Sequence, residues 1–288
     1  MKKLLFILLI TLPYVSHAQD DLMDLLDDGS DKKQYVPAAF HGSRIILGHS
    51  VVTRHKKELE FLISHRFGTI NSGSYEFFGL DNAFIRLGLE YGISDNFNVG
   101  VGRSSFDKTI DTFLKYRIAR QSTGVGSFPF SIVFIHSLAI KTTPRSSDDP
   151  TISFSDRLAT AHQVLIAHRF NDKLSLQLMP SFVQKNRTQG VDNSDQFALG
   201  AGGKVKLTRS VSLNVEYYYR IDEAENSVYN NSFSVGFDIE TGGHVFQLHF
   251  SNSAMTVERS FITETFGDFF DGDIRFGFNI SRTFQLGH

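Results

Sequence analysis

Hydrophobic and polar positions alternate along most of the chain from residue 44 onward. In residues 58–67 the odd positions hold Leu59, Phe61, Ile63, His65 and Phe67, and most even positions are charged or small. A period of two is typical of β-strands with one apolar and one polar face. No stretch carries a convincing helical period. The strands that this pattern predicts cover residues 58–67, 83–91, 97–102, 110–118, 128–140, 158–170, 174–182, 197–207, 211–221, 233–239, 246–250 and 274–286.

The links between these strands largely alternate between short and long. Short turns fall at residues 92–95, 171–172, 208–210 and 241–243, and longer polar links at 69–81, 142–156, 185–194, 222–230 and 251–272. Outer-membrane barrels have short periplasmic turns and longer outside loops, whereas a soluble sandwich has no reason to keep one class of loops long. The pattern therefore predicts an all-β fold, a closed antiparallel transmembrane β-barrel surrounded by outer-membrane lipid.

The number of strands follows from this topology. With the N- and C-termini both periplasmic the count must be even, which favours twelve strands beginning near Lys57. Residues 44–52 form a weaker thirteenth candidate. Fourteen strands are possible if this segment and a segment around residues 35–40 both join the barrel.

The polar face of the strands carries charges that a membrane barrel would turn toward its lumen. With the further positions Asp111, Arg157, Lys173, Asp238 and Glu240, it holds eleven basic and seven acidic residues, a surplus of four positive charges. The surplus favours anionic or neutral solutes if the lumen is open. Equally, the charges could pair across the lumen and close it, because twelve strands lie between filled and water-filled barrels. The lumen-lining candidates are Glu58, Glu60, Arg66, Arg86, Glu90, Lys115, Arg117, Arg169, Lys204, Lys206, Glu216, Arg220 and Arg275.

The first residues have the form of a secretory signal peptide. Lys2 and Lys3 precede an apolar stretch over residues 4–12, and Ser16-His17-Ala18 is a small-x-small cleavage site. The expected organisation is a signal peptide at residues 1–18, an acidic and largely disordered periplasmic segment at 19–43, and an outer-membrane barrel at 44–288.

The segment that follows the predicted cleavage site is strongly acidic. It could dock a periplasmic partner protein or remain a solvated, frayed terminus, and acidic termini are more often the latter. Its acidic residues are Asp20, Asp21, Asp24, Asp27, Asp28 and Asp31.

Composition narrows the possible functions. The 288 residues include no cysteine, which excludes disulfide frameworks, thiolate metal sites and cysteine nucleophiles. A net charge of −2 excludes a strongly basic nucleic-acid binder. There is no tryptophan, so the 28 phenylalanines and the tyrosines must supply the aromatic girdle at the membrane interfaces.

Candidate chemistry is sparse. Several of the 11 histidines fall in the apolar register of different strands, and a metal or haem site needs convergent ligands, so no metal and no cofactor is expected. No nucleophile–base spacing is recognisable, and we do not expect an enzyme.

Short motifs carry a resemblance to a known family. Gly48-His49-Ser50-Val51, Ile63-Ser64-His65-Arg66-Phe67-Gly68 and Val99-Gly100-Val101-Gly102-Arg103 are the clearest, and the match is best over residues 40–120. The chain resembles a domain-of-unknown-function family of exported outer-membrane β-barrel proteins of Gram-negative bacteria. The resemblance implies fold and location, and it makes His49 and His65 the motif residues to mutate first.

Three hypotheses for function follow. The first is a passive outer-membrane channel for small polar or anionic solutes. The second is a closed barrel that acts as a scaffold or receptor for a periplasmic partner through the acidic segment. An outer-membrane hydrolase comes third.

Overall fold

The structure is a computed structural model, which describes residues 32–143, 152–188, 193–221 and 223–287. The predicted signal peptide and the acidic residues Asp20 to Asp31 lie outside the described residues. Within the described part of the chain, no helix is long and apolar enough to cross a bilayer.

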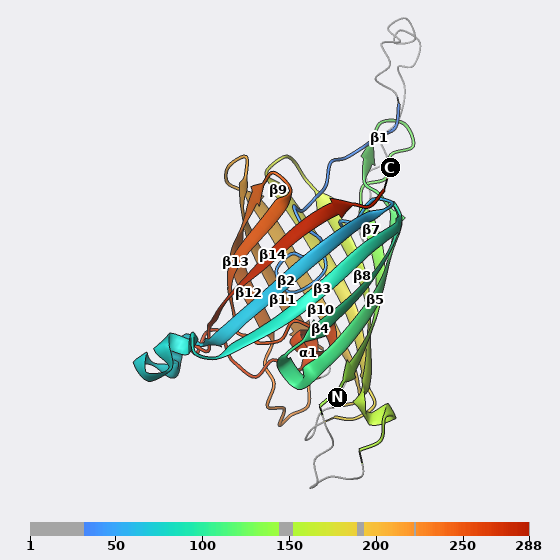
Figure 1. Ribbon diagram of the computed structural model, residues 1–288. Helices are drawn as coiled ribbons and strands as arrows, with labels where there is room; N and C mark the ends of the chain where they lie inside the picture. The colour runs from blue at the N-terminus through green and yellow to red at the C-terminus, as the bar shows by residue number, and fades with distance from the viewer. Residues whose placement is uncertain (1–31, 144–151, 189–192, 222, 288) are drawn as a thin grey trace, which may run out of the picture.

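Twelve antiparallel strands form a closed barrel, and each strand lies beside its sequence neighbour among the barrel strands (Figure 1). Every barrel strand coincides with one of the segments that the alternating pattern predicts. The barrel strands are β2 (Glu58–Thr69), β3 (Ala83–Ser94), β4 (Phe97–Ser104), β5 (Thr109–Ala119), β7 (Ser131–Lys141), β8 (Leu158–Arg169), β9 (Leu174–Lys185), β10 (Asp195–Lys206), β11 (Val211–Arg220), β12 (Ser232–Thr241), β13 (His244–Ser251) and β14 (Arg275–Gln285).

The barrel closes where its first strand pairs with its last. The register of β2 and β14 runs from Glu58 opposite Gln285 to Thr69 opposite Arg275, with one irregularity between Arg275 and Gly277. Because this pairing removes the last free sheet edge, the ring is complete without any further strand.

The two ends of the barrel differ in their connections. At the short-turn end lie the tight turns that follow β3, β8, β10 and β12, together with both ends of the barrel sequence. A two-residue pair of strands, β1 (Gln34–Tyr35) and β6 (Ser122–Thr123), also lies there outside the barrel sheet. The long-loop end carries the links after β2, β7, β9, β11 and β13.

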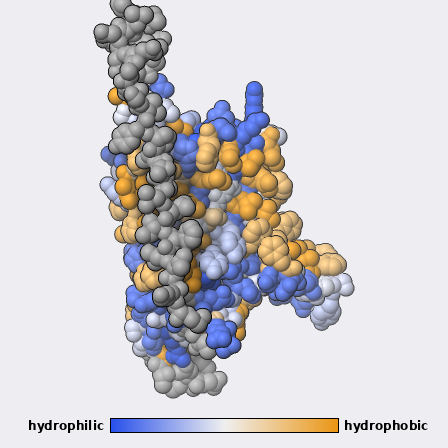
Figure 2. Space-filling model, turned by 180° about the vertical axis from the view of Figure 1, so that it is seen from behind, coloured by the Kyte–Doolittle hydropathy of each residue, from blue (hydrophilic) through white to orange (hydrophobic). Residues whose placement is uncertain are grey.

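The outer face of the barrel is apolar and rich in aromatic rings. Leu87, Leu114, Leu178 and Phe237 are each close to half exposed, as lipid-facing side chains are when the protein is considered without its membrane. The β2–β3 loop, with short 3-10 turns η1 (Ile70–Ser72) and η2 (Ser74–Gly79), projects sideways from the long-loop end. Figure 2 shows apolar side chains on both the barrel wall and this projection.

The lumen is filled by two segments of the same chain. Residues 36–56, here called the lumen insert, enter from the short-turn end and turn back to reach β2 (Figure 1). Residues 252–274, here called the inner loop, come from the long-loop end and carry the short helix α1 (Glu258–Thr263), whose six residues are all buried. The predicted boundary at residue 44 falls inside the insert.

The weaker thirteenth strand predicted at residues 44–52 is wrong, and so is the fourteen-stranded alternative. These residues form a tight hairpin inside the ring, with a single bridge between Arg44 and His49 and hydrogen bonds from Ile45 N to Gly48 O and from Ser50 N to Ser43 O. Residues 36–40 also stay outside the sheet. The short stretch of alternating apolar and polar positions in this segment belongs to a hairpin whose side chains pack on all sides, and not to a strand of the sheet.

Candidate functional site

All thirteen lumen-lining candidates occupy the alternate strand positions that face inward. Eight of them are buried, while Glu58, Arg117, Arg169 and Lys206 lie near the short-turn end and Arg275 near the long-loop end. The eight buried candidates are Glu60, Arg66, Arg86, Glu90, Lys115, Lys204, Glu216 and Arg220.

Several of these charges pair with each other along the wall. Arg86 on β3 binds both carboxylate oxygens of Asp111 on β5, and Lys115 Nζ lies 3.7 Å from Glu90 Oε1. A charge buried without a partner is costly, so such pairing is what lets the lumen wall hold ions away from bulk water. Each pair neutralises one basic and one acidic group, so the net surplus of positive charge remains.

Glu216 on β11 binds the backbone at the turn of the lumen insert. Its carboxylate accepts hydrogen bonds from the backbone N–H groups of Ile46 at 2.9 Å, Leu47 at 3.1 Å and Gly48 at 2.8 Å. A hydrogen bond to a charged group contributes roughly 1.5–3 kcal/mol, about twice an ordinary one. This single side chain therefore satisfies the backbone at the tip of the hairpin.

Amide side chains from other strands bind the rest of the insert backbone. Gln177 accepts from Val51 N at 2.9 Å and donates to His49 O at 2.7 Å. Gln247 Nε2 donates to Ile45 O at 2.9 Å, and Asn279 Nδ2 donates to Ile46 O at 2.8 Å. Side chains from β9, β13 and β14 thus bind the backbone of the insert.

The tip of the insert is apolar and packs on an apolar half of the wall. Ile45, Ile46 and Leu47 belong to one buried cluster with wall residues of β5, β7, β8, β9 and β11 and with α1. Burying an aliphatic side chain of this size is worth about 1.5–3 kcal/mol. The wall and α1 members of the cluster include Phe113, Val133, Ile135, Leu165, Met179, Tyr218, Phe261 and Ile262.

Two glycines make this close fit possible. A Cβ on Gly48 would lie 2.1 Å from the Tyr218 hydroxyl, and one on Gly202 of β10 would lie 2.6 Å from Ile45 Cδ1. Neither distance leaves room for a methyl group. Gly202 therefore leaves room for a large neighbour, as is common for glycine inside a strand.

The insert and the inner loop meet at one carboxylate in the middle of the lumen. Glu258 Oε1 lies 2.6 Å from Arg44 Nη1 and 3.0 Å from His49 Nε2. The ring of Phe113 packs edge-on against His49, with ring centroids 4.6 Å apart, and also lies below Arg44. We refer to Arg44, His49 and Glu258 as the latch, because they join the segments that fill the lumen from its two ends.

Burial sets the charge states of the latch. Burial lowers the pKa of His49 well below its usual range, the Arg44 cation lowers it further, and contact with Glu258 opposes both. Burial alone would raise the pKa of Glu258, but Arg44 and His49 outweigh it and hold that pKa well below its usual range. At neutral pH the latch therefore consists of a cation, a neutral imidazole and a carboxylate.

The two motif histidines lie in different environments. His49 is fully buried in the latch. His65 faces outward from β2, where its ring stacks on Phe278 with 4.9 Å between centroids and tilts against Phe67. Among the described residues, no group of three or more possible ligands is placed to hold a metal ion.

The apolar inner wall and the insert were not predicted, although the sequence carries a signal for them. Residues 132–135 and 164–167 are uninterrupted apolar runs, Ile-Val-Phe-Ile and Val-Leu-Ile-Ala, inside strands that otherwise alternate. A strand with two apolar faces is covered on both sides. The second face of β7 and β8 therefore indicates that something fills the lumen.

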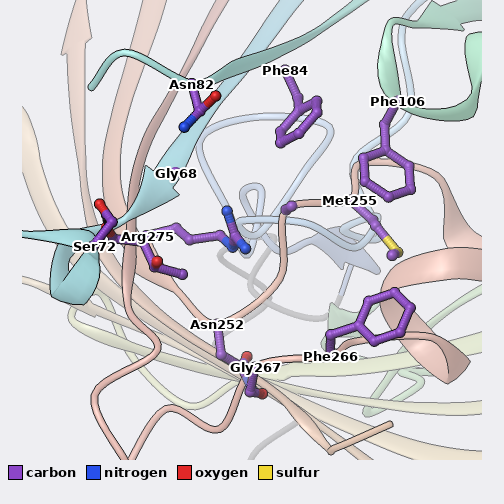
Figure 3. Close-up of a pocket in the computed structure, with 12 residues that line it drawn as sticks. Gly68, Ser72, Asn82, Phe84, Phe106, Asn252, Met255, Phe266, Gly267 and Arg275 are labelled. Carbon is purple, nitrogen blue, oxygen red and sulfur yellow. Dashed lines mark hydrogen bonds between the residues drawn. The ribbon is translucent and has the colours of Figure 1, made fainter. Parts of the chain in front are cut away.

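A cavity lies at each end of the barrel. At the short-turn end a cavity of about 670 Å³ is lined by Lys33, Arg117, Arg120, His55 and Asp95 among others. At the long-loop end a cavity of about 290 Å³ lies between the strand ends and the inner loop, with Arg275 in its wall (Figure 3).

Comparison with known proteins identifies the family. Residues 40–284 match the model of a family described as a membrane-bound beta barrel domain, DUF5777. The chain belongs to this family. The family resemblance predicted from residues 40–120 is thus confirmed, and the match extends over the whole DUF5777 barrel. No curated protein matches the chain.

Solved structures show the same fold at low sequence identity. The DUF5777 barrel is similar to the NanC porin, with 10% identity, a TM-score of 0.50, and coverage of 79% of this chain and 100% of the porin. An outer-membrane channel from Pseudomonas putida F1 has 12% identity, a TM-score of 0.48, and coverage of 81% and 97%. At this identity the likeness to the NanC porin shows the fold alone.

Proposed function

We propose that this DUF5777 protein is an outer-membrane channel for small polar or anionic solutes, and that the lumen insert closes it. In this proposal the short-turn end, where β2 begins and β14 ends, faces the periplasm and the long loops face outward, as in other outer-membrane barrels. The structure then corresponds to the closed state of the channel.

The observation that carries the proposal is that the insert lies inside the ring without belonging to it. The sheet closes through β2 and β14 alone. The wall holds the insert by side-chain bonds such as those of Glu216 and Gln177. Moving the insert therefore breaks no strand pairing. It would expose the apolar half of the wall together with charged and amide groups that hydrate readily.

The charges favour anions over cations as the permeating species. The short-turn cavity has three fixed cations, Lys33, Arg117 and Arg120, against one carboxylate, Asp95. Rings and clusters of Lys and Arg select for anions in pores. With the buried apolar tip and the latch in place, the closed state should dominate.

Conductance measurements on matched variants test this proposal. Replacing residues 40–51 by a Gly-Ser linker of equal length should convert a silent or rarely open protein into one with steady, discrete conductance in planar bilayers. The matched control replaces residues 70–81, in the projecting loop, by a linker of the same length and should behave as the wild type. A heat-dependent gel shift confirms that each variant forms a folded barrel. Silence from the folded insert variant would contradict the channel.

The filled lumen also favours a second candidate, a closed barrel that serves as a receptor for a periplasmic partner. The insert continues toward the N-terminus into the segment with Asp20 to Asp31, on which such a partner would act. Deletion of residues 20–31 should then abolish co-purification of a periplasmic protein while the barrel stays folded. The two candidates differ in whether the insert variant conducts.

A further inference from the structure

The cavity at the long-loop end combines one positive charge with an apolar wall. Figure 3 shows Arg275 reaching toward the centre of the cavity, with Phe84, Phe106, Phe266 and Met255 around the other side. Phe84 and Phe106 pack edge to face, with centroids 5.2 Å apart. Arg275 is the only charged residue among the described residues that line this cavity.

The guanidinium of Arg275 has hydrogen-bonding capacity left over. Its Nη1 donates to Phe67 O at 3.2 Å, while its buried Nε has no partner among the described residues. Buried donors are almost always satisfied, so an unpaired one calls for an explanation, such as a bound water, ion or ligand. A guanidinium with adjacent free N–H groups fits a carboxylate.

Three of the other polar side chains that line the cavity already have hydrogen-bond partners. Ser72 donates to Thr69 O, and Asn82 donates to Glu76. Asn252 donates to Asn231 O and Gly267 O, and its oxygen accepts from Phe233 N. Asp273, the nearest acidic neighbour in sequence, accepts from Asn71 Nδ2 and from the backbone N–H of Asp268 and is not part of the lining. Thus Arg275 supplies the charged contact, and Phe84, Phe106, Phe266 and Met255 offer an apolar wall beside the polar residues of the lining.

We propose that this cavity binds a small carboxylate with an aromatic or branched aliphatic body. The carboxylate would contact Arg275 and the apolar body would pack among Phe84, Phe106, Phe266 and Met255. A volume of about 290 Å³ lies at the small end of the range for ligand pockets. The role of the site as the outer entry point of the pore rests on the proposed channel function, whereas binding itself does not.

Equilibrium dialysis of radiolabelled benzoate against the folded protein in lipid nanodiscs tests the proposal. Saturable binding should be displaced by unlabelled benzoate and not by its uncharged isostere benzamide. Arg275→Gln should weaken benzoate binding by about 10-fold or more, the usual worth of a charged hydrogen bond. Phe106→Ala should weaken it by removing apolar contact.

Arg282→Gln is the matched control. Arg282 lies near the other end of the same strand, β14, where its side chain is exposed and stacks on Phe284. Its affinity for benzoate should equal that of the wild type. Equal binding of benzoate and benzamide, no saturable binding, or an unchanged affinity in Arg275→Gln would each overturn the proposal. If the Gly-Ser insert variant conducts while benzoate fails to bind, this site falls and the channel stands. If benzoate binds while that variant does not conduct, the site stands and the channel falls.

Discussion

At the scale of single residues, the insert is held by contacts that leave no spare volume. The backbone of Gly48 lies so close to Tyr218 and Glu216 that a side chain at this position would not fit. The same turn presents three backbone N–H groups to one carboxylate. A small change at this turn should therefore act on the position of the insert and leave the strands unaffected.

Gly48→Ala tests this expectation. The added methyl group must displace the insert from a closely packed wall, at a cost of about 1–3 kcal/mol to the closed state. The open probability in planar bilayers should rise by about 5–150-fold. Gly242→Ala is the control, because a Cβ there meets no atom within 4 Å. Equal open probability for the two variants would show that the fit at Gly48 does not hold the insert closed.

At this scale the sequence predicts which charges face inward but not which groups they bind. A period of two assigns Glu216 and Lys115 to the polar face, because the side chains of a strand alternate. Their partners Gly48 and Val52 lie about 170 and 60 positions away in a segment without regular structure. No local pattern encodes that kind of contact.

At the scale of elements, two segments with no shared sheet meet through the latch. The insert contributes Arg44 and His49, and α1 contributes Glu258. Lys115 on β5 and Arg86 on β3 are the other charged groups that act on these side chains. Strand segments were predictable because each repeats a simple pattern. The latch was not, because α1 has only six residues and the insert has no period.

Because of the latch, we expect acidic pH to favour release of the lumen insert. The pKa of His49 lies well below 6.5 in the closed state and returns toward 6.5 when the insert is released. Below pH 6.5 the released state therefore binds a proton that the closed state does not, and falling pH favours release. At pH 5.5 the effect on the open-to-closed ratio reaches about tenfold. The depressed pKa of Glu258 acts in the same direction at lower pH, because protonation removes the partner of Arg44.

Bilayer recordings between pH 7.5 and 5.5 check this. His49→Gln should flatten the pH dependence, while His55→Gln should keep it, because the His55 side chain is 68% exposed. A wild-type open probability that is independent of pH would exclude the latch as a proton-sensitive contact.

At the scale of the whole molecule, the closed ring and its filling are separate parts. The strands of the ring explain the alternation of apolar and polar positions in the sequence. The lumen insert and the inner loop explain the apolar runs in β7 and β8 that interrupt this alternation. The charge balance of the lumen also depends on this separation, because several wall charges are paired with each other and others bind the insert.

Lys204 is suited to test selectivity, since it is buried in the wall of β10 and lies near the ring of Phe40 in the insert. In the Gly-Ser insert variant, Lys204→Glu should shift the reversal potential in a salt gradient toward cation preference. Arg209→Glu, in the exposed turn between β10 and β11, makes the same charge change and should shift it far less. Equal shifts would mean that net charge, and not the lumen wall, determines selectivity.

The position of the insert immediately before β2 also constrains how the molecule is assembled. The first barrel strand pairs with the last, so the ring closes only when the two ends of its sequence meet. Pairings between residues so far apart in the chain form slowly. The hairpin, tethered beside β2, can therefore settle against the wall before the seam shuts. The finished ring then encloses a segment that never had to enter through either mouth.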